Sequence, residues 1–126
     1  MDKQTEILIV DDQHEVREAI RFILKDKYSI AAVGGVEEAF RYLEVTSVKL
    51  VLLDIKMPKI DGITALEHIK KKYPGTEVIM VTAFATLETV RKAVRLGAFG
   101  FLMKPFDIDV LIKTVDGVLN NIENKR

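Results

Sequence analysis

Side chains that could hold a metal ion and a phosphoryl group follow four short apolar runs in this sequence. They are Asp11 and Asp12 after residues 7–10, Asp54 after 50–53, Thr82 after 78–81, and Lys104 after 99–103. If the runs are parallel strands, their carboxyl ends share one edge of a sheet, where ligands of α/β proteins bind. We therefore expect three carboxylates, one hydroxyl and one ammonium group to converge on a single small site.

The three carboxylates predict a site for a hard divalent cation. Asp11, Asp12 and Asp54 would repel one another without a cation, because like charges disfavour ionisation. Mg²⁺ prefers oxygen ligands and commonly binds one or two carboxylates together with a phosphate oxygen, and Mn²⁺ is an alternative ion. Taken alone, an Asp-Asp pair also suits a helix cap. Its occurrence together with Thr82 and Lys104 favours the metal site.

The same set could support transfer of a phosphoryl group to a carboxylate. Asp54 could act as a nucleophile on phosphorus and form an aspartyl phosphate. Lys104 and Thr82 would then supply a positive charge and a hydroxyl donor to the transferring oxygens. Each also has a simpler interpretation, as a solvent-facing lysine and a strand threonine. The Lys104–Pro105 bond is a candidate cis peptide.

Composition limits the classes of protein to consider. The chain has 126 residues, which predicts one domain. Its 19 basic and 19 acidic residues balance, so bulk charge gives no reason to expect nucleic-acid binding. No cysteine is present, and neither a signal peptide nor a membrane span is apparent. We expect a soluble, cytoplasmic protein.

The apolar runs alternate with amphipathic segments. Strands are expected at residues 7–10, 28–33, 50–53, 78–81 and 99–103, and helices at 14–27, 36–45, 63–72, 86–96 and 107–121. Thr86 is expected to cap the fourth helix, and residues 120–126 are expected to fray. Strict alternation predicts a parallel sheet with helices on both faces.

These motifs together resemble the receiver domain of two-component response regulators. The resemblance spans residues 6–119 and rests on four segments: ILIVDD (7–12), LVLLDIKMPKIDG (50–62), VTA (81–83) and LGAFGFLMKPF (96–106). It implies one receiver domain over residues 1–126 with a flavodoxin-like (βα)5 fold and strand order 2-1-3-4-5. The closest motifs are those of receivers of enhancer-type ATPase regulators and of single-domain phosphorelay proteins.

The resemblance also implies roles for the residues of the acidic site. Asp54 looks like the acceptor of a phosphoryl group from a sensor histidine kinase or a histidine phosphotransfer protein. Asp12, Asp54 and the backbone carbonyl of Lys56 look like Mg²⁺ ligands, and Asp11 would act through a metal-bound water. Lys104 would pair with Asp54 or with its phosphate. No other cofactor is implied, and catalysis is limited to the domain's own phosphorylation and dephosphorylation.

Two further residues match the family's switch positions. Thr82 looks like the switch hydroxyl and Phe101 like the switch aromatic, although Phe101 could also be an ordinary apolar strand residue. Phosphorylation would remodel the surface formed by residues 86–96, 99–103 and 107–121. The family commonly uses this surface for homodimers or partner docking, and direct contact with nucleic acid is not expected.

Three further residues suggest how long the phosphoryl group persists and where a partner binds. Lys56 and Phe84 occupy positions that the family uses to tune phosphoryl lifetime. A long cation and a bulky ring could hinder an attacking water, which predicts slow self-dephosphorylation. Phe22 lies off the apolar face of the first helix and could contact a phosphotransfer partner, or it could pack locally.

Two other functions are weighed against the receiver hypothesis. A flavodoxin-like mononucleotide-binding domain would need a phosphate loop after the first strand, where this chain has DDQH. An aspartyl phosphatase usually has a second carboxylate two residues after its nucleophile, where this chain has Lys56. The sequence leaves open whether the chain is a natural single-domain protein or the first domain of a larger regulator. It also leaves the output, the cognate kinase and the signal open.

Overall fold

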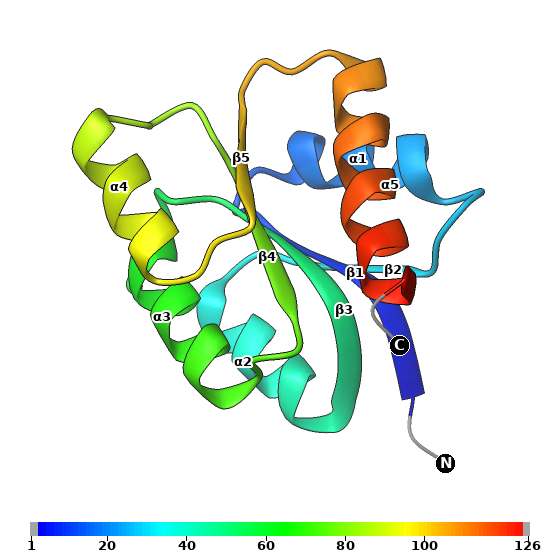
Figure 1. Ribbon diagram of the computed structural model, residues 1–126, viewed down its shortest axis with the longest axis horizontal. Coiled ribbons are helices and arrows are strands. Elements are labelled where there is room, and N and C mark those ends of the chain that lie inside the picture. The colour runs from blue at the N-terminus through cyan, green and yellow to red at the C-terminus, as the bar shows by residue number, and fades with distance from the viewer. Residues whose placement is uncertain (1–2, 125–126) are drawn as a thin grey trace.

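The computed structural model describes residues 3–124 as a five-stranded parallel sheet with helices on both faces (Figure 1). The strands lie in the order β2-β1-β3-β4-β5, as predicted. The elements in chain order are β1 (Lys3–Val10), α1 (His14–Leu24), β2 (Ile30–Val33), α2 (Val36–Val45), β3 (Thr46–Leu53), α3 (Gly62–Lys72), β4 (Glu77–Thr82), α4 (Leu87–Arg95), β5 (Gly100–Met103) and α5 (Ile108–Asn124).

Two apolar cores sandwich the sheet. Helices α2, α3 and α4 cover one face, and α1 and α5 cover the other (Figure 1). Successive strand residues point to opposite faces, so Leu8 and Val10 pack with the first group of helices, whereas Ile7 and Ile9 pack with the second. Because both faces are covered, the strands are apolar throughout residues 7–10, 50–53 and 78–81.

Strands β1 and β3 are longer than the apolar runs that predicted them. They begin at Lys3 and Thr46, and these two residues face each other in the parallel ladder. Polar residues continue the pairing, since Gln4 faces Ser47. Helix α2 ends at Val45 and β3 begins at Thr46, so no loop separates them. A search for apolar runs misses the first residues of β1 and β3, because backbone hydrogen bonds extend the strands there through residues with polar side chains.

The ends of the helices agree with the predictions in some places and differ in others. Thr86 caps α4, as predicted, in a capping box with Thr89. Helix α1 ends at Leu24, three residues earlier than expected. The predicted fraying from residue 120 is wrong as far as Asn124, because α5 continues to that residue and Ile122 packs against the core. Residues 125 and 126 lie outside the described part of the chain.

Helix α5 is held to the sheet by apolar and polar contacts. Leu111 and Val115 are fully buried against the sheet, and Asp116 accepts hydrogen bonds from Lys27 at 2.8 Å and from the Tyr28 hydroxyl. These bonds fix α5 to the segment that enters β2. No helix within residues 3–124 combines the length and the apolar character that a membrane span requires.

Candidate functional site

Backbone hydrogen bonds bring the ends of four strands to one edge of the sheet. The Asp54 N–H donates to the carbonyl of Val10 at 3.1 Å, which places the start of the β3–α3 loop beside Asp11. At the other side of the site, the Lys104 N–H donates to the carbonyl of Thr82 at 3.0 Å. The strand register thus places these side chains together, and the Lys104–Pro105 bond is cis, as predicted.

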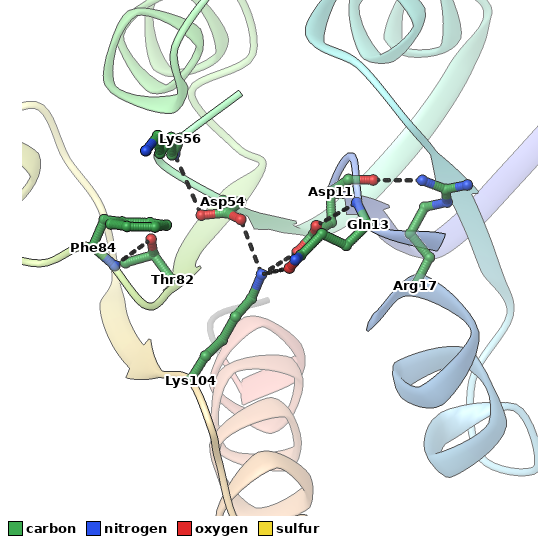
Figure 2. Close-up of polar contacts among 8 residues, drawn as sticks. All are labelled: Asp11, Gln13, Arg17, Asp54, Lys56, Thr82, Phe84 and Lys104. Atoms are coloured by element: carbon green, nitrogen blue, oxygen red, sulfur yellow. Dashed lines mark hydrogen bonds and ion pairs between the residues drawn. The ribbon is translucent and has the colours of Figure 1, made fainter. Parts of the chain in front are cut away.

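The Lys104 ammonium lies at the centre of this edge (Figure 2). Its Nζ donates to Asp11 Oδ2 at 2.6 Å and to Asp54 Oδ2 at 2.9 Å. The two carboxylates are 3% and 5% exposed, and the lysine side chain is 12% exposed. Burial lowers the pKa of Lys104, but the hydrogen bonds and charges of Asp11 and Asp54 outweigh it, so the pKa lies above its ordinary value. The lysine is therefore a fixed positive charge at neutral pH.

The carboxylates form a compact group of oxygen donors. Asp11, Asp12 and Asp54 each offer a carboxylate oxygen, and these oxygens lie within 4.8 Å of one another. Asp11 and Asp54 are buried, whereas Asp12 is exposed and opens the group to solvent. Three clustered carboxylates beside a single lysine leave excess negative charge. The donor set and its charge fit a hard divalent cation such as Mg²⁺.

The opposite wall of the site is formed by the loops after β3 and β4. The buried Thr82 hydroxyl oxygen accepts a hydrogen bond from the Phe84 N–H at 3.0 Å. The Lys56 N–H approaches Asp54 Oδ1 at 3.4 Å. The Lys56 ammonium lies 4.5 Å from the centre of the Phe84 ring, a cation–π contact between the two loops. Figure 2 shows both residues on the Asp54 side of Lys104.

Phe101, the predicted switch aromatic, lies apart from the polar group. It is partly buried on β5, next to Met80 of β4, and packs against the core beneath α3 and α4. Its side chain is therefore linked to the α4 face of the sheet rather than to the carboxylates.

Gly62 belongs to the motif of residues 50–62 and supports the site through its lack of a side chain. It begins α3, and its N–H donates to the carbonyl of Ile55 at 2.7 Å. A Cβ atom here would lie 1.9 Å from the carbonyl oxygen of Asp54 and 2.7 Å from the Cα of Ile55. Only glycine allows the helix to approach the backbone that carries Asp54.

Two further residues support the loop that carries Asp11, and the sequence analysis assigned neither a role. The Arg17 guanidinium donates from Nη1 to the carbonyl of Asp11 at 2.8 Å. The Gln13 N–H donates to Asp11 Oδ1 at 2.9 Å, and its side-chain oxygen accepts from Lys104 at 3.3 Å. The only signal in the sequence was a glutamine where a helix cap would be expected.

Comparisons with known proteins agree on one family. The family model described as response regulator receiver domain matches residues 7–116. The chain is 38% identical over 116 residues to the chemotaxis protein CheY of Halobacterium salinarum, covering 90% of this chain and 96% of that protein. A crystal structure of a CheY-like receiver domain protein from Methanospirillum hungatei superposes with a TM-score of 0.92 at 31% identity, covering 100% of each chain.

Several matched regulators are much longer than this chain. The chain is 36% identical over 111 residues to an uncharacterized transcriptional regulatory protein of Bacillus subtilis, YhcZ, covering 86% of this chain but 52% of that protein. It spans 23% of the length of two further matched regulators. The shared region is therefore the part of these proteins that resembles a receiver.

Replacement of Gly62 tests whether the close approach of α3 to the Asp54 backbone requires glycine. We expect Gly62→Ala to lower the free energy of unfolding by about 1–3 kcal/mol, because the new methyl group overlaps the Asp54 carbonyl. Urea unfolding followed by circular dichroism gives this value.

Gly117 of α5 offers a matched control. A Cβ at Gly117 meets nothing within 4 Å, so Gly117→Ala should raise the stability by about 0.5–1 kcal/mol through helix propensity. Equal stability of Gly62→Ala and the native protein would show that the backbone tolerates the methyl group and that glycine is not required there.

Proposed function

Because this chain belongs to the response regulator receiver domain family, we propose that Asp54 is its phosphoacceptor and that the surrounding residues form its phosphorylation site. Receiver domains are signalling modules, and the role of the family is a phosphorylation-dependent switch. The observation that carries the proposal for these residues is the Lys104 ammonium, which contacts the buried carboxylates of Asp11 and Asp54 at 2.6 and 2.9 Å.

In the proposed transfer, a carboxylate oxygen of Asp54 attacks phosphorus in a donor phosphohistidine. The new oxygen–phosphorus bond forms as the bond from phosphorus to the imidazole nitrogen breaks, and the electron pair of that bond stays with the imidazole. Lys104 is already in contact with Asp54 and can follow the negative charge onto the phosphoryl oxygens. The domain would thus catalyse only its own phosphorylation and dephosphorylation.

Receiver domains bind Mg²⁺ at their acidic site, and we propose that this chain does so through Asp11, Asp12, Asp54 and the backbone carbonyl of Lys56. Asp11 would act through a water. When bound, the ion would supply positive charge that offsets the clustered carboxylates and the incoming phosphoryl group. Asp12 is the exposed member of the group, so we expect the ion to enter the site from solvent beside it.

Thr82 is the proposed first residue of the switch. Its hydroxyl oxygen holds the Phe84 N–H at 3.0 Å. Movement of the hydroxyl toward a phosphoryl oxygen would weaken that bond and bias the β4–α4 loop toward a second arrangement. Phe101 packs under α4 and would respond to the shift. Phosphorylation would in this way change the populations of two conformations of the α4 face.

The surfaces beside this site suggest partners. Receiver domains interact with histidine kinases or phosphotransfer proteins, and we propose one of these as the phosphoryl donor. An apolar patch next to Lys104 could receive a donor helix; it consists of Val16, Ala19, Ala83, Pro105 and Phe106. Phe22 is 70% exposed on α1 and could extend the contact.

A homodimer is the proposed use of the α4–β5–α5 surface. This surface carries large exposed apolar side chains, which are Leu87, Val94, Phe99, Met103, Ile108 and Val110. Apolar groups of this size in one region often mark a protein interface. We further propose that residues 6–119 are the functional unit and that output comes from this surface rather than from direct contact with nucleic acid.

The mononucleotide-binding alternative is not favoured. The loop after β1 carries two carboxylates rather than a phosphate-binding loop, and the comparisons find receiver domains. Anionic side chains at this position would repel a nucleotide phosphate.

The proposal is tested by the intact mass of the protein after incubation with Mg²⁺ and acetyl phosphate. We expect one added phosphoryl group, because Asp54 lies beside both the acidic group and Lys104. Asp54→Asn should remain unmodified, and so should the native protein in EDTA. Phosphoryl addition to Asp54→Asn at the native rate would contradict the assignment of the acceptor.

The contact between Lys56 and Phe84 supports slow self-dephosphorylation. Both residues line the pocket over Asp54, and the ammonium lies 4.5 Å from the ring centre. We expect Lys56→Asn together with Phe84→Glu to shorten the half-life of the phosphorylated protein about tenfold, which corresponds to about 1.4 kcal/mol in the barrier. Loss of added mass over time, after removal of the donor, gives the half-life.

A similar pair that does not line the pocket over Asp54 serves as the control, since the half-life is measured without a partner. Lys25 lies 4.8 Å from the ring centre of Phe22 on α1, so Lys25→Asn with Phe22→Glu changes the same chemistry elsewhere. This control should keep the native half-life. An unchanged half-life in the Lys56 and Phe84 variant would show that the pair does not shield Asp54 from water.

A further inference from the structure

Gln13 is the N-cap residue of α1, but its side chain does not cap the helix. Its backbone is extended (φ −89°, ψ 111°), as at a helix N-cap, but its side chain makes no capping hydrogen bond. Asn, Asp, Ser and Thr are the residues that normally fill this position, because their short side chains reach the free N–H groups of the first turn. The glutamine therefore leaves a helix end without its side-chain cap.

The side chain of Gln13 reaches across the site to Lys104 instead. Its Oε1 accepts a hydrogen bond from Lys104 Nζ at 3.3 Å, and its backbone N–H donates to Asp11 Oδ1 at 2.9 Å (Figure 2). A lysine ammonium has three N–H donors. Asp11, Asp54 and Gln13 are thus acceptors for all three. Gln13 is also the neutral member of this set.

We propose that Gln13 is a positioning residue that holds the Lys104 ammonium in place for phosphoryl transfer to Asp54. The inference rests on the proposed function of Asp54. A neutral acceptor restricts the long and flexible lysine without adding a further negative charge beside the ammonium. A third carboxylate at this point would instead compete for the ammonium and add to the negative charge near Asp54.

One variant separates an effect on the position of Lys104 from an effect on the stability of α1, because it should slow phosphorylation without destabilising the protein. Gln13→Ser shortens the side chain beyond reach of Lys104 but introduces a favoured N-cap residue. We expect its midpoint of urea unfolding to equal or exceed that of the native protein. Its rate constant for phosphorylation by acetyl phosphate, measured by intact mass at saturating Mg²⁺, should fall about three- to tenfold.

Two further comparisons complete the experiment: Gln13→Met in the native protein, and both Gln13 replacements in the Lys104→Met variant. Gln13→Met keeps the length of the side chain and removes the acceptor, so it should slow phosphorylation to a similar extent. In Lys104→Met, replacing Gln13 should cause no further loss, because the group it positions is absent. The inference is overturned if Gln13→Ser and Gln13→Met react at the native rate, or if they slow the Lys104→Met protein by the same factor.

The same measurements distinguish this inference from the proposed function. Failure of the native protein to take up any phosphoryl group would overturn both. Native phosphorylation that is absent in Asp54→Asn, together with native rates in both Gln13 variants, would overturn the role of Gln13 alone.

Discussion

The pairing of one lysine with two buried carboxylates is the interaction on which the site depends. Asp11 and Asp54 are almost completely buried at neighbouring strand ends, and buried like charges are unfavourable without a compensating cation. Lys104 supplies that cation from the end of β5 and contacts both carboxylates. Asp11, Asp54 and Lys104 follow β1, β3 and β5 and are distant in sequence. The site therefore forms only when the sheet brings the ends of these strands together. The phosphoryl chemistry proposed for Asp54 uses the same lysine.

Backbone geometry gives that interaction its position. The Asp54 N–H bonds to the carbonyl of Val10, and the Lys104 N–H bonds to the carbonyl of Thr82, so the acidic and basic strand ends are tied to their neighbours. Gly62 then lets α3 pack directly on the backbone of Asp54. Thr82 is part of the same edge, and its hydroxyl holds the loop that leads to α4. Asp54, where the charge would change, therefore lies close to the β4–α4 loop that is proposed to move.

The sequence predicted the fold class and the strand ends because both depend on local pattern. Apolar runs that end in Asp11, Asp54 and Thr82 identify buried parallel strands and the edge at which ligands bind. The strand order came from the resemblance of whole motifs, and the structure and the comparisons confirm it. Contacts between distant backbones were not predictable in this way. The clearance at Gly62 and the bond from Lys104 to Gln13 depend on how strands and helices approach one another, and no spacing in the sequence encodes either distance.

The most direct test of the central interaction is the coupling energy between Lys104 and Asp54. It is obtained from the free energies of unfolding, in EDTA, of the native protein, Lys104→Met, Asp54→Asn and the double variant. We predict that Lys104→Met costs about 3–5 kcal/mol, because two buried carboxylates lose their cation, and that the cost is smaller by about 1–3 kcal/mol when Asp54 is already Asn. The same cost in both backgrounds would show that Lys104 does not stabilise the Asp54 carboxylate and would contradict the account of the site.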